Sequence, residues 1–286
     1  MKISILIPTH NRRVMVGEAI RKIFSLEPRA FHEVIVSDNH STDGTEKALF
    51  EEFGNKIAFT QPKTPVTAYQ NWRHSYDQAS GTHVHFHWSD DWLGGNFYTH
   101  ARLRQEQTGS NFFMTSARVV HEDGFNPVFY SQGGSRRLAP PKALRRLFLE
   151  EGGELPRSPM AYLFPRDGLR ESWWDSIPSV NGHDPLKLAI GPDALLIAGA
   201  LLKEKTGLEI LPGPDVCFRH HAGSISVQNE RLLGLYQHCY LFFARQHRLR
   251  ELELALLAGG SKSPPRDSWF RRLRKSLFRP GGASVS

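Results

Sequence analysis

Four strand-like runs alternate with helix-like segments in the first 110 residues, and this regular alternation is the strongest constraint on the fold. Strands are predicted over 3–7, 33–37, 57–60 and 83–88, and helices over about 14–26, 43–53 and 66–79. Strands that alternate with helices at this spacing form mostly parallel sheets with right-handed crossovers. The sequence therefore predicts an α/β fold in which helices flank a mostly parallel sheet.

Polar clusters directly follow the first, second and fourth of these strands. They are Thr9-His10-Asn11, Asp38-Asn39 and Asp90-Asp91. Ligands of open α/β sheets bind at the carboxyl ends of the strands. Because the carboxyl ends of parallel strands share one edge, we expect the three clusters to form a single site.

The chain beyond residue 110 follows no simple alternation. Strands are expected over 112–120 and 127–131, helices over 141–149 and 192–203, and either one long helix or two over 230–257. This pattern divides the chain into 1–110, 111–228, a helical region at 229–260 and a tail at 261–286.

Three segments of the chain together resemble glycosyltransferase family 2. They are Ile5–Arg12, Val34–Thr45 and Ser89-Asp90-Asp91, in this order and at this spacing. The resemblance is good over the N-terminal third and patchy afterwards. It implies a GT-A-like, Rossmann-type fold that binds a nucleotide sugar with residues 1–110. The more irregular half at 111–228 would bind the acceptor and carry out catalysis, followed by a helical C-terminus.

The resemblance implies donor-binding roles for Pro8, Thr9, Asn11, Asp38, Asn71 and Asp90. The carboxylate of Asp38, at a strand end, is able to accept a hydrogen bond from a pyrimidine N–H group. Aspartate also favours turns, so a local turn role is the alternative for Asp38. We interpret Asp43 as a helix N-terminal residue rather than a ligand, and Arg12 and Arg13 as solvated.

The adjacent carboxylates of Asp90 and Asp91 repel each other unless a cation or solvent offsets their charge. A divalent cation that bridges them to a diphosphate would provide this offset and neutralise the departing nucleoside diphosphate. We therefore expect Mn²⁺ or Mg²⁺, with Asp91 as a direct ligand. Ser89 stands where the family often has another aspartate, and an acid pair in a capped loop is the alternative.

A fourth segment, from Arg219 to Ser226, resembles the His-Pro-Gly-Ser segment of the family. The resemblance implies that His221 is a further metal ligand, with His220 as the alternative, and Ala222 replaces the proline. The alternating His83, His85 and His87 are the ligand type of a zinc site. We favour buried, hydrogen-bonded histidines instead, with His87 beside the donor pocket.

An inverting transfer needs a base that takes the proton of the acceptor hydroxyl. The family places a carboxylate at a helix start in the acceptor half, which implies Asp193 as the base and Asp184 as the alternative. A carboxylate in the first helical turn also stabilises the helix dipole without any catalytic role. Trp173 and Trp174 are candidates for stacking on sugar rings or for the core, and residues 157–160 for shaping the acceptor pocket.

The net charge of +7 is partly concentrated in the basic segment 266–279. Trp269, Phe270, Leu273 and Leu277 share one face of this segment at helical spacing. The pattern is typical of a helix that lies on an anionic membrane surface, with a solvated tail as the alternative.

Other features bear on the compartment. Cys217 and Cys239 are the only cysteines, far apart in the chain, which fits a reducing compartment. No apolar run approaches the roughly 18–20 residues that span a membrane. We expect a soluble cytoplasmic protein, peripheral at the inner face of the plasma membrane if the tail binds lipid.

The resulting prediction is an inverting, metal-dependent transfer from a nucleoside-diphosphate sugar to a hydroxyl acceptor. A lipid-linked or surface glycan in bacterial polysaccharide assembly is the expected acceptor. A nucleotidyltransferase is a rival, but it would need a glycine-rich, basic loop after the first strand, and residues 7–11 contain none. A basic nucleic-acid-binding module is the other rival. We expect no nucleic-acid partner, because the basic residues gather in the tail and acids occupy the strand ends.

Overall fold

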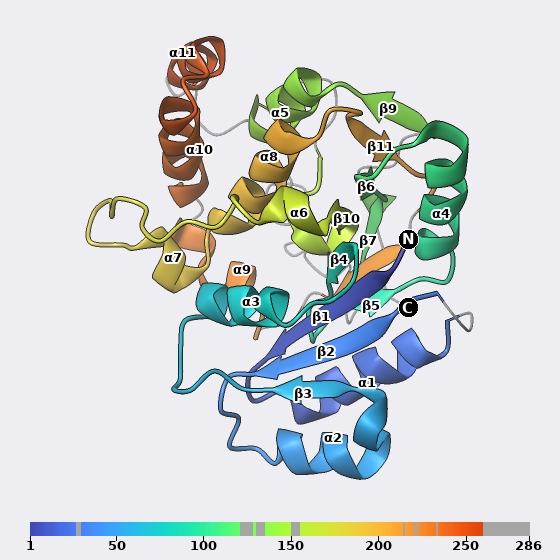
Figure 1. The fold of residues 1–286 in the computed structure, drawn as a ribbon. Helices are drawn as coiled ribbons and strands as arrows, with labels where there is room; N and C mark the ends of the chain where they lie inside the picture. Colours follow the sequence, from blue (N-terminus) through green and yellow to red (C-terminus); the bar gives the residue numbers. More distant parts are fainter. Residues whose placement is uncertain are drawn as a thin grey trace, which may run out of the picture.

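The computed structural model describes residues 1–26, 30–120, 128–129, 135–149, 155–213, 215–219, 221, 223–232 and 234–259. At its centre lies an eight-stranded sheet (Figure 1). In spatial order its strands are β3 (Ala58–Thr60), β2 (Glu33–Asp38), β1 (Ile3–Thr9), β4 (His83–Phe86), β10 (Tyr162–Pro165), β6 (Phe113–Met114), β11 (Leu208–Ile210) and β9 (Arg136–Leu138).

The first four strands of the chain confirm the predicted parallel sheet. β1 pairs in parallel with β2 on one side and β4 on the other, and β2 pairs in parallel with β3. The chain order therefore reverses at β1, so the carboxyl ends of β1 and β4 flank a topological switch point, where α/β proteins bind ligands. β10 is antiparallel to β4 and links this half to the rest of the sheet.

Side-chain alternation along the strands builds a core on each face of the sheet. Ile5, Ile7 and Val36 belong to a cluster with α1 (Arg13–Phe24) and α2 (Thr45–Phe53). Leu6 and Ile35 face the other cluster. That cluster includes α3 (Ala68–Asp77), α5 (Pro140–Leu149), α8 (Pro192–Lys203) and α10 (Leu235–Gln246). Successive strand residues point to opposite faces, which is why one buried strand serves both clusters.

The structure corrects the single strand expected over 112–120. The chain instead leaves the central sheet after β6 and starts β7 (Ala117–Val120) in a second sheet. That sheet also contains β5 (Trp92–Leu93), β12 (Val216–Arg219) and β8 (Val128–Phe129). The break lies at Thr115 and Ser116, which separate β6 from β7 and belong to neither strand. Of the strand expected over 127–131, residues 128–129 are described and form β8.

Helix boundaries mostly follow the predictions within a few residues. The helix expected from Thr42 or Asp43 begins at Thr45, after Gly44 at φ 81°. A capping box of Thr67 and Gln70 starts α3. The region 230–257 contains two main helices, α10 and α11 (Arg250–Gly259), because the chain turns at Arg248, which has φ 54°. Helices not anticipated are α4 (Phe97–Thr108), α6 (Arg166–Leu169), α7 (Pro185–Leu188) and α9 (Ile225–Gln228).

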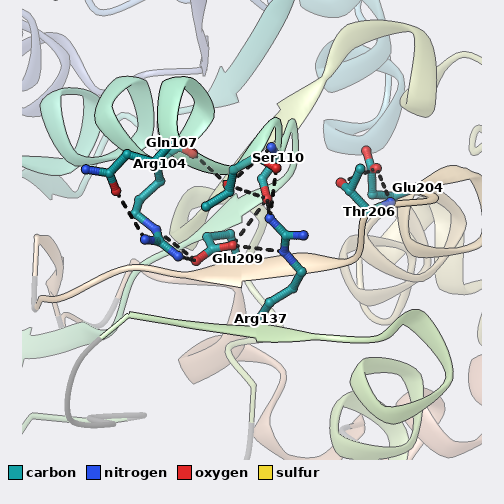
Figure 2. A network of polar contacts seen from close by, with 8 residues as sticks. Arg104, Gln107, Ser110, Arg137, Glu204, Thr206 and Glu209 are labelled. Atoms are coloured by element: carbon teal, nitrogen blue, oxygen red, sulfur yellow. Dashed lines mark hydrogen bonds and ion pairs between the residues drawn. The ribbon is translucent and has the colours of Figure 1, made fainter.

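A buried ion cluster joins α4, β9 and β11 away from the strand ends (Figure 2). Glu209 is fully buried, and its carboxylate accepts hydrogen bonds from Arg104 Nε at 3.0 Å and from Arg137 Nε at 3.2 Å. Ser110 Oγ donates a further bond at 3.2 Å. A buried carboxylate is tolerated because these donors compensate its lost hydration.

Candidate functional site

The polar clusters converge on one cavity of about 580 Å³ at the carboxyl edge of the sheet. Thr9 lines it from the end of β1, Asn39 from the end of β2, and Asp90 and Asp91 from the segment after β4. The three strand ends therefore border one cavity, as parallel pairing predicts. Asp193, in the first turn of α8, also lines the cavity.

The acidic pair is held by side chains from both halves of the chain. Arg12 Nη1 lies 2.6 Å from Asp90 Oδ2, and His221 Nε2 lies 3.0 Å from the same oxygen. The backbone N–H of Arg219 donates to Asp91 Oδ1 at 2.8 Å, and Arg219 Nε donates to the carbonyl of Asp90. Arg12 and Arg219 therefore place positive charge beside the two carboxylates.

This arrangement shifts the pKa values of the two carboxyl groups in opposite directions. Burial alone would raise the pKa of Asp90, but the hydrogen bond to His221 and the charge of Arg12 outweigh it and lower that pKa. Burial, and then the negative charge of Asp90, hold the pKa of Asp91 well above its ordinary value. Asp91 therefore takes up a proton more readily than Asp90 does. A cation at the pair would favour ionisation of both.

Arg12 is therefore not the solvated side chain that we predicted. It lines the cavity, pairs with Asp90 and donates from Nη2 to the carbonyl of Gly223 at 3.0 Å. Arg13 is exposed, as expected. Arg219, for which we predicted no role, contacts both acids and pairs with Glu18 at 2.8 Å. The sequence signal for a site role of Arg12 was its position directly after the strand-end cluster Thr9-His10-Asn11.

His221 comes close to Asp90 rather than to Asp91. The backbone N–H of Gly223 donates to His221 Nδ1 at 3.1 Å, so in the neutral ring Nε2 carries the proton and donates to Asp90. Binding a metal through Nε2 would require His221 to give up this pattern. His220 and Ala222 lie outside the described residues.

The donor types at the acidic pair fit a divalent cation that is also bound by phosphates. Carboxylate oxygens suit Mn²⁺ and Mg²⁺. Within the described residues, no group of three or more His, Cys, Asp or Glu side chains is placed to hold a metal ion. Protein ligands would thus be Asp90, Asp91 or both, with His221 only after rearrangement, and donor phosphates and water would complete the shell.

Four of the six residues expected to bind the donor line the cavity: Pro8, Thr9, Asn71 and Asp90. Thr9 Oγ1 is buried and has no hydrogen-bond partner among the residues that the structure describes, so it is available to a ligand polar group. Asn71 is fixed instead: Oδ1 accepts from Ser37 Oγ at 2.6 Å, and Nδ2 donates to the carbonyl of Ser37 at 2.9 Å.

Asn11 and Asp38 do not belong to the lining of this cavity. Asn11 Oδ1 accepts from the backbone of Thr42 at 2.7 Å, which ties the loops after β1 and β2 together. Asp38 is fully buried and accepts from Ser41 N at 3.0 Å and from Gln61 Nε2 at 2.9 Å. Both side chains shape the loops in this structure, and their contact with a donor stays a prediction.

Asp43 lies at the start of α2, in the role that the sequence favoured. Its Oδ1 accepts from the backbone N–H of Thr45 at 3.1 Å, and its Oδ2 from that of Arg13 at 2.9 Å. The carboxylate therefore satisfies backbone donors at the first turns of both α2 and α1. This explains Asp43 without a ligand.

Aromatic side chains form part of the cavity wall, but not the two that we singled out. Trp72 and Trp88 line the cavity with ring centroids 4.9 Å apart, and Trp88 Nε1 donates to Ser158 Oγ at 2.7 Å. Trp173 packs against Tyr69, Tyr76 and Phe86, and Trp174 against Phe242, which favours the core interpretation. Arg157 and Ser158 do line the cavity, as residues 157–160 were expected to.

Asp193 lines the cavity, and the pKa of its carboxyl group is raised. Its Oδ2 accepts from Tyr236 Oη at 2.6 Å and its Oδ1 from the backbone of Ala194 at 2.9 Å. Burial raises the pKa of Asp193 to about 6, although both hydrogen bonds oppose this rise. A carboxylate with this pKa is charged at neutral pH and still able to take a proton.

Asp184 has a structural role. It precedes α7, and its Oδ1 accepts from the backbone of Leu186 at 2.9 Å and of Lys187 at 3.3 Å. This is an N-cap, and Asp184 is absent from the cavity lining. Among the described residues, the geometry therefore favours Asp193 over Asp184 as a base.

The three alternating histidines are buried, as expected. His85 bonds to Tyr98 Oη at 2.6 Å and to the carbonyl of Met160 at 2.7 Å, and burial lowers its pKa to about 3. Burial also lowers the pKa of His83 and of His87 to about 4. His87 Nδ1 lies 2.9 Å from the carbonyl of Trp88, close to the acids, but His87 is not a lining residue.

The protein family follows from a comparison with family models. The model described as glycosyl transferase family 2 matches residues 4–171, more than half of the chain. The chain belongs to glycosyltransferase family 2. The match includes the strand-end clusters and Asp90-Asp91 and ends before Asp193 and His221, so the roles of those two residues rest on their geometry.

Solved glycosyltransferase structures share the GT-A fold of this family 2 chain. Staphylococcus aureus TarS 1–349 with UDP-GlcNAc has a TM-score of 0.63 at 19% identity, covering 86% of this chain and 71% of TarS 1–349. TarS 1–349 alone has a TM-score of 0.60 at 18% identity, over 85% and 70%. The longer TarS structure has a TM-score of 0.59 at 18% identity, over 86% and 42%. At this identity the likeness establishes the fold.

A search of curated proteins by sequence finds no match for this glycosyltransferase. Among the helices that the structure describes, none is both long and apolar enough to cross a membrane. The basic tail, 261–286, lies outside the described residues, so its membrane contact stays a prediction.

Proposed function

We propose that this family 2 glycosyltransferase moves a sugar from a nucleoside-diphosphate donor to a hydroxyl acceptor with inversion. One observation carries the proposal: Asp90-Asp91 at the sheet edge and Asp193 at the start of α8 line the same cavity. A diphosphate site and a tuned carboxylate in one cavity are the two parts that this reaction needs.

In the proposed reaction, Asp193 takes the proton of the acceptor hydroxyl while the acceptor oxygen forms a bond to the anomeric carbon. The bond between that carbon and the donor phosphate breaks on the opposite face, and the nucleoside diphosphate leaves with the bonding electrons. Attack opposite the leaving group inverts the configuration. Trp72 and Trp88 offer apolar surface for a sugar ring.

The diphosphate would lie at the acidic pair, and Thr9 Oγ1, unpartnered within the described part of the chain, lines the same cavity. We propose that Asp91, Asp90 or both hold Mn²⁺ or Mg²⁺ together with the diphosphate. The bound cation would neutralise the charge of the leaving group. Arg12 is placed to add positive charge at the same end of the cavity.

A lipid-linked or surface glycan in bacterial polysaccharide assembly remains the proposed acceptor, because family habit and the basic segment 266–279 support it. Segment 266–279 would then bring the enzyme to the anionic inner face of the plasma membrane from a cytoplasmic location. The segment combines arginine charge with an apolar face, which is the composition that binds such surfaces.

A panel of UDP, GDP, CDP and dTDP sugars, with release of nucleoside diphosphate as the readout, tests the function. We expect Mn²⁺-dependent release with one donor class, and a matching thermal shift with that nucleoside diphosphate. The configuration of the product, read by NMR, tests inversion. No release and no shift with any nucleotide would overturn the proposal.

A further inference from the structure

We propose that Tyr236 is the positioning residue of the base, orienting the Asp193 carboxylate toward the acceptor side of the cavity. Tyr236 Oη donates to Asp193 Oδ2 at 2.6 Å, and both residues line the cavity. Tyr236 lies on α10, beyond the residues that the family model matches. The inference deepens the proposed function and rests on it for the catalytic consequence alone.

The two oxygens of Asp193 are held by different elements. The backbone N–H of Ala194 fixes Oδ1 from α8 itself, whereas Tyr236 fixes Oδ2 from α10. Two donors on different oxygens define the plane of the carboxylate as well as its position. The lone pairs that remain then point in fixed directions, as a base near its substrate requires.

Arg157 holds the Tyr236 ring in turn. Its guanidinium carbon lies 5.5 Å from the centroid of the Tyr236 ring and 5.9 Å from that of Tyr240, one turn further along α10. Cation–π contacts of this kind restrain the ring. Arg157 also lines the cavity, so the base, its tyrosine and the arginine form a continuous wall.

The close approach of α10 to the start of α8 depends on Gly191. Gly191 has φ 101°, and a Cβ at this position would lie 3.0 Å from Cys239 Cβ and closer still to its sulfur. A side chain there would push α10 away and lengthen the bond from Tyr236 to Asp193. Glycine therefore permits the contact that lets the C-terminal helical region reach the base.

Among the described residues, the charged and titratable groups that interact with Asp193 are Tyr236 and Cys239 from α10 and Arg157 from the segment before β10. Tyr236 and Cys239 are neutral at working pH, because burial raises the pKa of each. Replacing Tyr236 by Phe thus removes a hydrogen bond to the carboxylate and leaves the nearby charges unchanged.

The test is Tyr236→Phe in the full chain, with Tyr240→Phe as the matched control on the same helix. Carboxyl ¹³C NMR of Asp-labelled protein measures the pKa of Asp193, and its signal is assigned by loss in Asp193→Asn. We expect the pKa of Asp193 to rise by about one unit in Tyr236→Phe, since a hydrogen bond to a charged group is lost. The control should leave it unchanged. An unchanged pKa in Tyr236→Phe, or an equal rise in the control, overturns the inference.

Kinetics supply a second readout. Tyr236→Phe should lower kcat roughly tenfold, keep the KM for the donor, and move the acidic limb of the rate to higher pH. An unchanged kcat with an unchanged pH profile would overturn the positioning role. The NMR titration needs no substrate, so it decides the contact even if no nucleotide sugar is turned over, an outcome that counts against the proposed function alone.

Discussion

Arg12 and Asp90 form an ion pair across the cavity edge, with 2.6 Å between Nη1 of the arginine and Oδ2 of the aspartate. The two side chains come from the ends of the neighbouring strands β1 and β4, and both are largely shielded from solvent. The pair therefore places a positive charge beside an acidic cluster whose repulsion, by sequence alone, was expected to be offset by a cation or solvent.

We expect Arg12→Ala to destabilise the protein by roughly 1–3 kcal/mol at pH 7, because it leaves a buried carboxylate with less compensation. The loss should shrink as the pH falls below about 4. Asp90, whose pKa is lowered in the folded state, contributes stability at higher pH that disappears when it is protonated. Urea unfolding at several pH values measures this. Arg13→Ala is the control, and an equal loss in Arg13→Ala would contradict the assignment.

Asp91→Asn should remove the thermal shift that Mn²⁺ and the nucleoside diphosphate produce together, and turnover with it. The reason is that asparagine presents a neutral amide where the cation needs a carboxylate. Parallel shifts for Asp90→Asn show which carboxylate matters more. Retained metal-dependent binding in both variants would place the cation elsewhere.

Asp193→Asn should lower turnover roughly 10²–10⁴-fold while donor binding is kept, because an amide cannot take the acceptor proton. In the unmodified enzyme the rate should rise with pH through about 6, since burial raises the pKa of Asp193 to about 6 and only the charged form is a base. Steady-state kinetics from pH 5 to 8 measure this rise, because the range begins about one unit below that pKa. Asp184→Asn is the comparison, since asparagine also caps helices. Turnover lost only in Asp184→Asn would reverse the assignment.

Glu209→Gln should lower the free energy of unfolding by roughly 2–4 kcal/mol, because it leaves Arg104 and Arg137 without their shared buried carboxylate. Neither Glu209 nor the side chains that bond to it (Figure 2) line the cavity, so the nucleotide-induced thermal shift should persist in the folded variant. Glu171→Gln removes a surface pair with Lys203 and should have no measurable effect. Equal effects of the two substitutions would show that burial of Glu209 is not the cause.

The sequence alone determined the parallel half of the sheet and the edge that carries the site. The apolar runs within 3–7 and 33–37 are local signals, and they also indicate which polar residues end each strand. The short strands after residue 110 were beyond such reasoning, because β6 and β11 have two and three residues and acquire their pairing only from the sheet. Their identity depends on tertiary contacts.

Within the site, the sequence identified Asp90, Asp91, His221 and Asp193 as candidates, but only the tertiary structure determined their partners. Asp90 meets Arg12 and His221, and Asp193 meets Tyr236, through contacts between segments far apart in the chain. Side-chain periodicity records which face a residue occupies, not which distant helix packs against it. Local sequence patterns thus identified the candidate site residues, whereas packing between distant segments determined the contacts that shift their pKa values.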